Sequence, residues 1–267
     1  MNKIDLSVVI VNYNGEKFLP DCIQSLKLQL QDLNYEIVIV DNLSNDNSVA
    51  YIKFNYPEIV LIESKENLGF GKGNNLGVEH AKGEFILLFN NDTILLTPVT
   101  PGLNLLRNDA SIGVIGANMF NGNKEYTYAC GYFPNALNML IFKKFLMHQG
   151  EFANGNFTKK TYEVDWMSGS FLLLKKQVYL EINGFDPDYF MYVEDVDICK
   201  KIADKQLKRI FMPELKYIHY VGFDPKKNPL IINGYRIYIK KHFGFVKQII
   251  LNISLSITKV VKHFKYQ

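Results

Sequence analysis

An apolar run that ends in two amides and a carboxylate is the first place in this chain where chemistry is expected. In the segment FILLFNNDTILL, residues 85–96, Asn90, Asn91 and Asp92 follow a stretch with the composition of a buried strand. Hard oxygen ligands at such a position suit Mg²⁺ or Mn²⁺ bound together with a diphosphate. The other interpretation is a strand that simply ends in a polar turn.

A second group of acids lies much later, in the segment YVEDVDIC. Glu194, Asp195 and Asp197 fall at the expected start of a helix, where the helix dipole favours acids without any further role. Asp197 is spaced to pair with Lys201 one turn later. Asp195 shares its side of the helix with three apolar residues, Ile198, Cys199 and Ile202. We therefore expect Asp195 to turn inward, and a buried carboxylate needs a reason.

Both groups need a scaffold, and the first hundred residues alternate strands with helices. Short β-branched apolar runs at 6–11, 35–40, 59–63 and 84–89 are typical of strands buried on both faces of a parallel sheet. Between the first two, apolar residues recur at helical spacing from Leu19 to Leu30, and Pro20 fits the first turn of that helix. Asp46 is expected to cap a helix through Val49 and Ile52.

Polar loops follow each of these four strands. In a parallel α/β sheet, ligands bind beyond the carboxyl ends of the strands, so the loops are expected to share one rim. They comprise residues 12–15, 41–48, 65–75 and 90–93. The fold class is therefore α/β, with a nucleotide-binding βαβαβ half.

The second half of the chain is less regular. Residues 161–202 suggest a strand, a helix, a loop and a second helix. Neither a repeat nor a linker interrupts the sequence, which favours a single domain that spans residues 1–225, with a nucleotide-binding half at about 1–110 and a second half at about 111–225. Residues 226–267 form a C-terminal extension.

Composition excludes several classes of protein. The 267 residues are 48% hydrophobic, which is enough for a sizeable core. Three widely separated cysteines indicate neither a disulfide framework nor a zinc site. The N-terminus resembles a first strand rather than a secretory signal, and no apolar stretch is long enough to span a membrane, so a cytoplasmic location is expected.

Charge is distributed unevenly along the chain. Nine Lys and Arg residues and no acids follow residue 225, whereas the first 225 residues carry a net charge of −6. From Val246 to Phe264 apolar residues recur at helical spacing among lysines, which predicts a basic amphipathic helix. This helix either docks on the domain or lies on an anionic membrane surface. Nucleic acid is a poorer partner because the first 225 residues are acidic overall and the basic stretch contains no recognition motif.

Four segments resemble, in order and spacing, the family 2 glycosyltransferases of the GT-A fold, in particular bacterial rhamnosyltransferase-like members. They are VVIVNYNG, VDNLSNDNS, NLGFGKGNNLGVEHAKGEFILLFNNDT and GFDPDYFMYVEDVDICKKI, and they span residues 6 to about 202. The resemblance implies a Rossmann-like GT-A fold and the transfer of a sugar, with inversion, from a nucleoside-diphosphate sugar. It makes the half at about 111–225 the acceptor-binding half. It places Asn90, Asn91 and Asp92 at the DxD motif, with Asp92 as the metal ligand. Asn90 departs from the usual Asp, which predicts weaker metal affinity.

The same resemblance assigns roles to other residues. Asp41 stands where the family accepts the N3–H of uracil or thymine, and Asn12 and Tyr13 would line that pocket. Asp195 stands at the general base that takes the proton of the acceptor hydroxyl, with Glu194 in support. His219 stands where some relatives place a histidine near the metal or diphosphate; a lone histidine is otherwise a packed or surface residue.

The segment NLGFGKGNNLG supplies further ligand candidates. Its glycine spacing fails the dinucleotide pattern GxGxxG. Gly69 permits close approach of a ligand to the backbone, or merely marks a turn before a helix. The amides of Asn67, Asn74 and Asn75 could bind hydroxyls or phosphate.

Trp166 and Gly169 complete the candidate set. Trp166 is either a core residue or a platform on which a sugar stacks. Gly169, in the segment SGS, is expected in a turn close to the acceptor.

The sequence therefore predicts a metal-dependent glycosyltransferase. Its donor would be a UDP- or dTDP-linked sugar, and the sugar would be transferred to a hydroxyl of a glycan or lipid-linked acceptor in bacterial surface polysaccharide assembly. The enzyme would bind the inner face of the membrane through its basic C-terminus. A sugar nucleotidyltransferase and a non-catalytic protein that binds sugar nucleotides are the alternatives, and the Asn at position 90 favours the second of these.

Overall fold

The computed structural model describes residues 3–140, 145–220 and 228–265, with the side chains of 140, 228 and 258–265 left out. Lys226, Lys227 and the expected boundary at residue 225 lie outside the described residues, as do the side chains of Lys259, Lys262 and Lys265. The domain boundary therefore stays a prediction.

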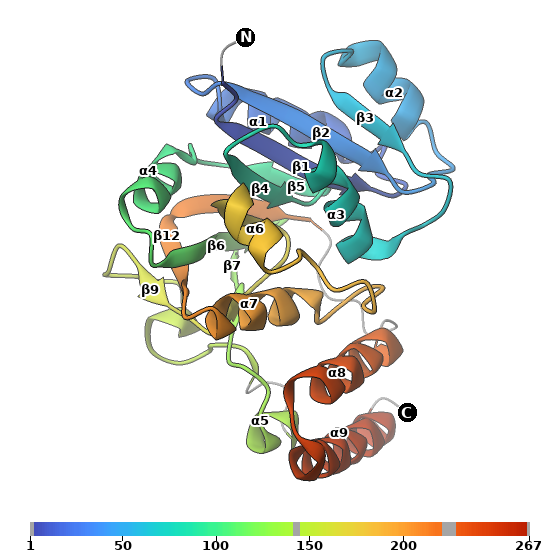
Figure 1. Cartoon of the computed structure of the whole chain (residues 1–267), viewed down its shortest axis with the longest axis vertical. Helices are drawn as coiled ribbons and strands as arrows, with labels where there is room; N and C mark the ends of the chain where they lie inside the picture. Colours follow the sequence, from blue (N-terminus) through green and yellow to red (C-terminus); the bar gives the residue numbers. More distant parts are fainter. Residues whose placement is uncertain (1–2, 141–144, 221–227, 266–267) are drawn as a thin grey trace.

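A sheet in the order β3-β2-β1-β4-β11-β6-β12-β5 forms the centre of the molecule (Figure 1). Its first four members are parallel: β1 Leu6–Asn12, β2 Tyr35–Asp41, β3 Val60–Glu63 and β4 Phe85–Phe89. The side chains of β1 and β4 are almost all buried, as expected for strands covered on both faces. All four predicted strands and the α/β class are confirmed.

Three helices connect these strands: α1 Leu19–Gln29, α2 Ser48–Asn55 and α3 Gly69–His80. Pro20 lies in the first turn of α1, as predicted. The N-cap residue of α2 is Asn47, one position later than expected, although a carboxylate oxygen of Asp46 accepts the Ser48 N–H at 3.0 Å.

The glycine segment is part of α3 itself. Gly69 opens this helix with a φ of +74°, and a Cβ there would lie 2.2 Å from the carbonyl oxygen of Phe190. A Cβ at Gly73 would lie 2.9 Å from a methyl group of Val11. These glycines therefore let α3 approach β1 and the loop around Phe190, so their close contacts are with protein.

The second half extends the sheet with mixed strands. β11 runs antiparallel to β4, whereas β12 runs parallel to β6. The segment 161–202 contains the predicted strand, helix, loop and helix as β11, α6, residues 182–193 and α7. The elements of this half are β5 Thr93–Leu95, α4 Thr100–Asn108, β6 Ile112–Asn121, β7 Tyr126–Thr127, β8 Cys130–Gly131, α5 Ala136–Leu140, η2 Gly150–Ala153, β9 Tyr162–Glu163, β10 Trp166–Met167, β11 Phe171–Lys175, α6 Lys176–Glu181, α7 Glu194–Asp204 and β12 Lys208–His219.

Two helices form the C-terminal extension, α8 Asn228–His242 and α9 Phe245–Lys265 (Figure 1). The sequence analysis predicted the second but not the first. Tyr235, Tyr238 and Ile239 of α8 belong to the hydrophobic core of the domain. α9 contacts α5 and α8 and buries Leu251 and Leu255.

The opposite face of α9 is apolar and exposed. It presents Phe245, Val246, Ile249, Ile250, Ile253 and Ile257. The helix thus docks on the domain and also leaves an apolar face free, so neither of the two expected roles excludes the other. Within the described residues, no helix has the length and apolar character needed to cross a bilayer.

Candidate active site

The carboxyl ends of β1 and β2 bring Asn12 and Asp41 side by side in register. The Asn12 amide donates to Asp41 Oδ1 at 2.9 Å, and the backbone N–H of Ser44 donates to Asp41 Oδ2 at 3.0 Å. The Asn91 amide in turn donates to Asn12 Oδ1 at 2.9 Å. Three loops far apart in sequence are therefore joined at one rim. Tyr13, beside them, is exposed.

Asn42 is a residue of this rim that the sequence analysis missed. Its amide donates to Asn67 Oδ1 at 3.0 Å and to the Gly69 carbonyl at 3.1 Å, and its Oδ1 accepts the Leu68 N–H at 2.8 Å. Asn42 thus ties the end of β2 to the start of α3. Its position directly after Asp41 at a strand end was the available signal.

Asn74 and Asn75 bind protein groups instead of facing the rim with free amides. Asn74 donates to the Phe70 carbonyl at 3.0 Å. The Asn75 amide donates to the Phe185 carbonyl at 2.8 Å, while its oxygen accepts the Phe185 N–H at 2.9 Å and the Tyr179 hydroxyl at 2.6 Å. Asn75 therefore fastens the loop after α6 to α3.

The loop between β4 and β5 meets the end of β12. Asp92 is buried, and its Oδ1 lies 3.3 Å from Nε2 of His219. The Asn90 amide nitrogen lies 3.4 Å from the same ring nitrogen, and Asn90 Oδ1 is buried without a hydrogen-bond partner. Antiparallel pairing of His219 with Thr93 explains why these residues meet.

Asp92, His219 and Asn90 carry a carboxylate, a ring nitrogen and an amide oxygen, which are types of group that can bind a divalent cation. Among the described residues, no group of three or more His, Cys, Asp or Glu side chains is arranged so that it could hold a metal ion. The buried, unpaired oxygen of Asn90 and the carboxylate of Asp92 are hard oxygen donors, which suit a cation whose remaining ligands come from a diphosphate.

Asp195 lies at the start of α7 beside the turn that precedes β11. Its Oδ2 accepts the Gly169 N–H at 3.3 Å, and its Oδ1 accepts the Val196 N–H at 2.9 Å. The next residue, Ser170, accepts the Asn90 N–H through its carbonyl at 3.3 Å. Two adjacent residues thus connect the acid of α7 with the loop that carries Asp92.

Burial changes the acidity of the two neighbouring carboxyl groups. Desolvation raises the pKa of Asp195 above the usual range for aspartate, while the hydrogen bonds from Gly169 and Val196 act in the opposite direction. Desolvation also raises the pKa of Glu194, and the charge of Asp195 raises it further. Oε2 of Glu194 is buried without a hydrogen-bond partner. A raised pKa brings Asp195 closer to neutral pH, where a general base is most effective.

The expected pairing of Asp197 with Lys201 is wrong. Asp197 is buried and accepts hydrogen bonds from the Tyr189 hydroxyl at 3.2 Å and from His242 Nε2 at 2.7 Å. Lys201 donates to the Gly184 carbonyl at 2.5 Å. The i,i+4 rule failed because His242 of α8 supplied a partner inside the fold, which local spacing does not reveal.

Trp166 and Gly169 differ in how close they come to the site. Trp166 is buried and donates its indole N–H to the Tyr132 carbonyl at 3.0 Å, which favours core packing over a stacking platform. Gly169 contacts Asp195 directly, and a Cβ there would lie 3.4 Å from Cβ of Asp195. The three cysteines, Cys22, Cys130 and Cys199, are buried free thiols.

The model of the family described as "Glycosyl transferase family 2" matches residues 7–197. The chain belongs to this family. Residues 7–197 include the loops of the rim and Asp195, which confirms the resemblance inferred from the sequence.

Two relatives match over most of their length. Rhamnosyltransferase WbbL of Escherichia coli is 25% identical over 92% of this chain and 94% of its own. The N-acetylglucosaminyl-diphospho-decaprenol L-rhamnosyltransferase of Mycobacterium tuberculosis is 24% identical over 84% of this chain and 78% of its own.

Solved structures share the fold of this glycosyltransferase. GalNAc-T7 with UDP, GalNAc and Mn²⁺ superimposes with a TM-score of 0.69 at 19% identity, over 88% of this chain and 48% of its own. S. aureus TarS 1-349 in complex with UDP gives a TM-score of 0.58 at 15% identity, over 98% of this chain and 72% of its own.

Proposed function

We propose that this protein transfers a sugar, with inversion, from a UDP- or dTDP-linked donor to a hydroxyl of a glycan or lipid-linked acceptor in bacterial surface polysaccharide assembly. The observation that carries the proposal is the connection between Asp195 and the loop of Asp92 through Gly169 and Ser170. The rhamnosyltransferase activities named for two relatives of similar length support the substrate class.

The donor base is bound at the rim formed by Asn12 and Asp41. Asp41 is buried and is fixed by Asn12 and by the Ser44 N–H, which leaves lone pairs of its carboxylate to accept the N3–H of uracil or thymine. Cytosine has no proton at N3 and would be rejected. Tyr13, exposed beside this pair, would cover the base.

The diphosphate is bound next to Asp92, His219 and Asn90. A divalent cation held there, Mn²⁺ or Mg²⁺, would neutralise charge that develops on the departing diphosphate. Asn90 contributes a neutral oxygen where a carboxylate is usual, so the cation depends more on the phosphates of the donor. The Mn²⁺ in the GalNAc-T7 structure supports a metal in this fold.

Asp195 removes the acceptor proton as the hydroxyl attacks the anomeric carbon. The N–H groups of Gly169 and Val196 hold the carboxylate in one orientation. Glu194 remains protonated beside it because burial and the charge of Asp195 both raise its pKa. Two adjacent acids thus take different protonation states, and only Asp195 acts as the base.

The exposed face of α9 docks on an anionic lipid surface at the inner face of the cytoplasmic membrane. Its isoleucines and Phe245 would enter the interface, and lysines such as Lys247 would meet lipid phosphates. The C-terminal extension carries basic residues and no acids from residue 226 onward, which favours an anionic partner. A prenyl-diphosphate-linked acceptor would lie at the same surface.

One assay tests the proposal against both alternatives. The protein is incubated with Mn²⁺ and a panel of UDP-, dTDP- and GDP-sugars, including dTDP-L-rhamnose, with a synthetic N-acetylglucosaminyl-diphospho-lipid as acceptor. Release of nucleoside diphosphate together with a glycosylated lipid supports sugar transfer. Pyrophosphate exchange would show a nucleotidyltransferase, and donor binding without release would show a non-catalytic protein.

A further inference from the structure

The backbone that delivers Asp195 to the site adopts an unfavourable conformation. Tyr192 and Val193, the two residues before α7, both have a φ of +74°. Residues that carry a Cβ rarely adopt this left-handed backbone conformation, and β-branched residues such as valine adopt it least readily. Two such residues in succession require contacts from elsewhere that hold them in place.

One of those contacts comes from the backbone of α8. A Cβ on Gly234 would lie 2.5 Å from the Tyr192 carbonyl oxygen and 2.8 Å from Cγ2 of Val193. The helix therefore lies directly against the turn, and a glycine is required for that approach.

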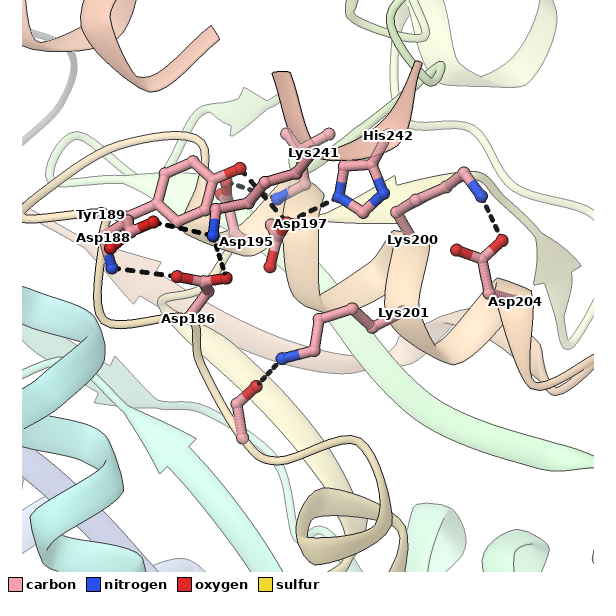
Figure 2. A network of polar contacts seen from close by, with 12 residues as sticks. Asp186, Asp188, Tyr189, Asp195, Asp197, Lys200, Lys201, Asp204, Lys241 and His242 are labelled. Carbon is pink, nitrogen blue, oxygen red and sulfur yellow. Dashed lines mark hydrogen bonds and ion pairs between the residues drawn. The ribbon is translucent and has the colours of Figure 1, made fainter. Parts of the chain in front are cut away.

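The end of α8 holds the same loop through charged side chains. Lys241 Nζ lies 2.7 Å from a carboxylate oxygen of Asp186 and 2.8 Å from one of Asp188, both in the loop between α6 and α7. Figure 2 shows Lys241 reaching this loop while the neighbouring His242 points to Asp197 in α7. Gly234 and Lys241 are seven residues apart, so they share one face of the helix.

The pair formed by His242 and Asp197 is the most enclosed of these contacts. Asp197 is 1% exposed and the His242 side chain 12%. Because the carboxylate can only accept, Nε2 of His242 is the donor at 2.7 Å. The other oxygen, Asp197 Oδ2, is buried without a hydrogen-bond partner, so loss of His242 would leave a buried carboxylate with the Tyr189 hydroxyl as its remaining side-chain donor.

We propose that α8 is a brace for the catalytic base: Gly234, Lys241 and His242 are positioning residues that hold the Tyr192–Val193 turn and the start of α7, and thereby set the place of Asp195. None of the three touches the reacting atoms. The inference rests on the proposed role of Asp195 as general base. It also gives α8 of the C-terminal extension a role in placing the base, separate from the membrane docking proposed for α9.

The test compares substitutions in α8 of the full-length protein. His242→Ala should lower kcat roughly 10- to 100-fold, because a displacement of about 1 Å at a reacting group has that effect. The KM for the donor and the affinity for UDP with Mn²⁺ should change less than about twofold, since Asn12 and Asp41 of the donor rim lie at the ends of β1 and β2. His242→Gln, which retains a donor, should recover most of kcat.

Two further variants keep the inference falsifiable. Lys241→Ala removes an exposed side chain and should lower kcat with the fold intact, whereas Lys240→Ala, an exposed lysine one position away, should leave kcat unchanged. The inference is overturned if His242→Ala and Lys241→Ala both retain wild-type kcat, or if UDP affinity falls in parallel with kcat. If these variants keep the wild-type kcat while Asp195→Asn is inactive, only the role of α8 is rejected. If Asp195→Asn is active, the role of Asp195 as general base is rejected as well.

Discussion

Replacement of Asp195 by Asn tests the proposed base directly. The two side chains have nearly the same shape, so the space beside Gly169 stays filled while the proton acceptor is removed. General base catalysis contributes roughly 10²- to 10⁴-fold, which corresponds to about 3 to 5 kcal/mol of transition-state free energy. We expect kcat to fall by that factor and the affinity for UDP to stay close to wild type, because Asp195 lies on α7 whereas Asn12 and Asp41 lie on β1 and β2.

Stability separates this effect from unfolding. A carboxyl group whose pKa is raised on folding binds more protons in the folded state, so it destabilises the fold as pH rises through that raised pKa. Asp195→Asn removes the free-energy cost of burying this charge, so the Tm of the variant at pH 8 should equal or exceed that of the wild type. Asp204→Asn, the same change at the exposed end of α7, is the matched control and should retain full kcat.

The assay is a steady-state measurement of nucleoside diphosphate release with the N-acetylglucosaminyl-diphospho-lipid acceptor, together with a calorimetric titration of UDP and a thermal melt. A kcat within about threefold of the wild type would refute the assignment of Asp195 as base. An equal loss of kcat and UDP affinity would show that the substitution disturbs the whole site.

Three further outcomes are expected. The ionised form of Asp195 is the active one and its pKa is raised, so kcat should fall as the pH is lowered, with a midpoint above about 4, the ordinary pKa of aspartate. Full activity at about pH 4 would contradict the raised pKa. Asn90→Asp should lower the Mn²⁺ concentration for half-maximal activity roughly tenfold, or about 1.4 kcal/mol, and an unchanged requirement would place the cation elsewhere. Replacing Ile249 and Ile253 on α9 by Ser should weaken binding to anionic vesicles, measured by co-sedimentation, by at least about tenfold, since each isoleucine buried in the membrane contributes about 1.5 to 3 kcal/mol. Turnover of a soluble acceptor should persist. Unchanged vesicle binding would show that this face of α9 is not the membrane-binding surface.

The nucleotide-binding half was predictable because its signals are local. Strands buried on both faces appear as continuous apolar runs, and a parallel sheet places the loops that follow them at one rim. The prediction that Asn12, Asp41 and the Asn90–Asp92 segment would gather there needed no knowledge of side-chain contacts. The structure confirms their meeting at the ends of β1, β2 and β4.

α8 was missed although its sequence carries a helical pattern. Ile231, Tyr235, Tyr238 and Ile239 recur at helical spacing and three of them are buried in the core. The absence of acids from residue 226 onward drew the interpretation toward a membrane surface. The charge pattern reflects the residues on the exposed side of the extension, whereas the apolar spacing within α8 indicates the face of the helix that packs on the core.

The sequence by itself determined the order of the strands along the chain, the loops that carry polar residues and the acids capable of catalysis. Tertiary structure alone decided which of those groups have partners. The amide of Asn75 fastens the loop after α6 to α3, and Asp197 pairs with His242, which lies 45 residues later in the sequence. α8 also holds the Tyr192–Val193 turn. Hydrogen bonds and desolvation depend on atoms brought together by folding, and local spacing contains no information about them.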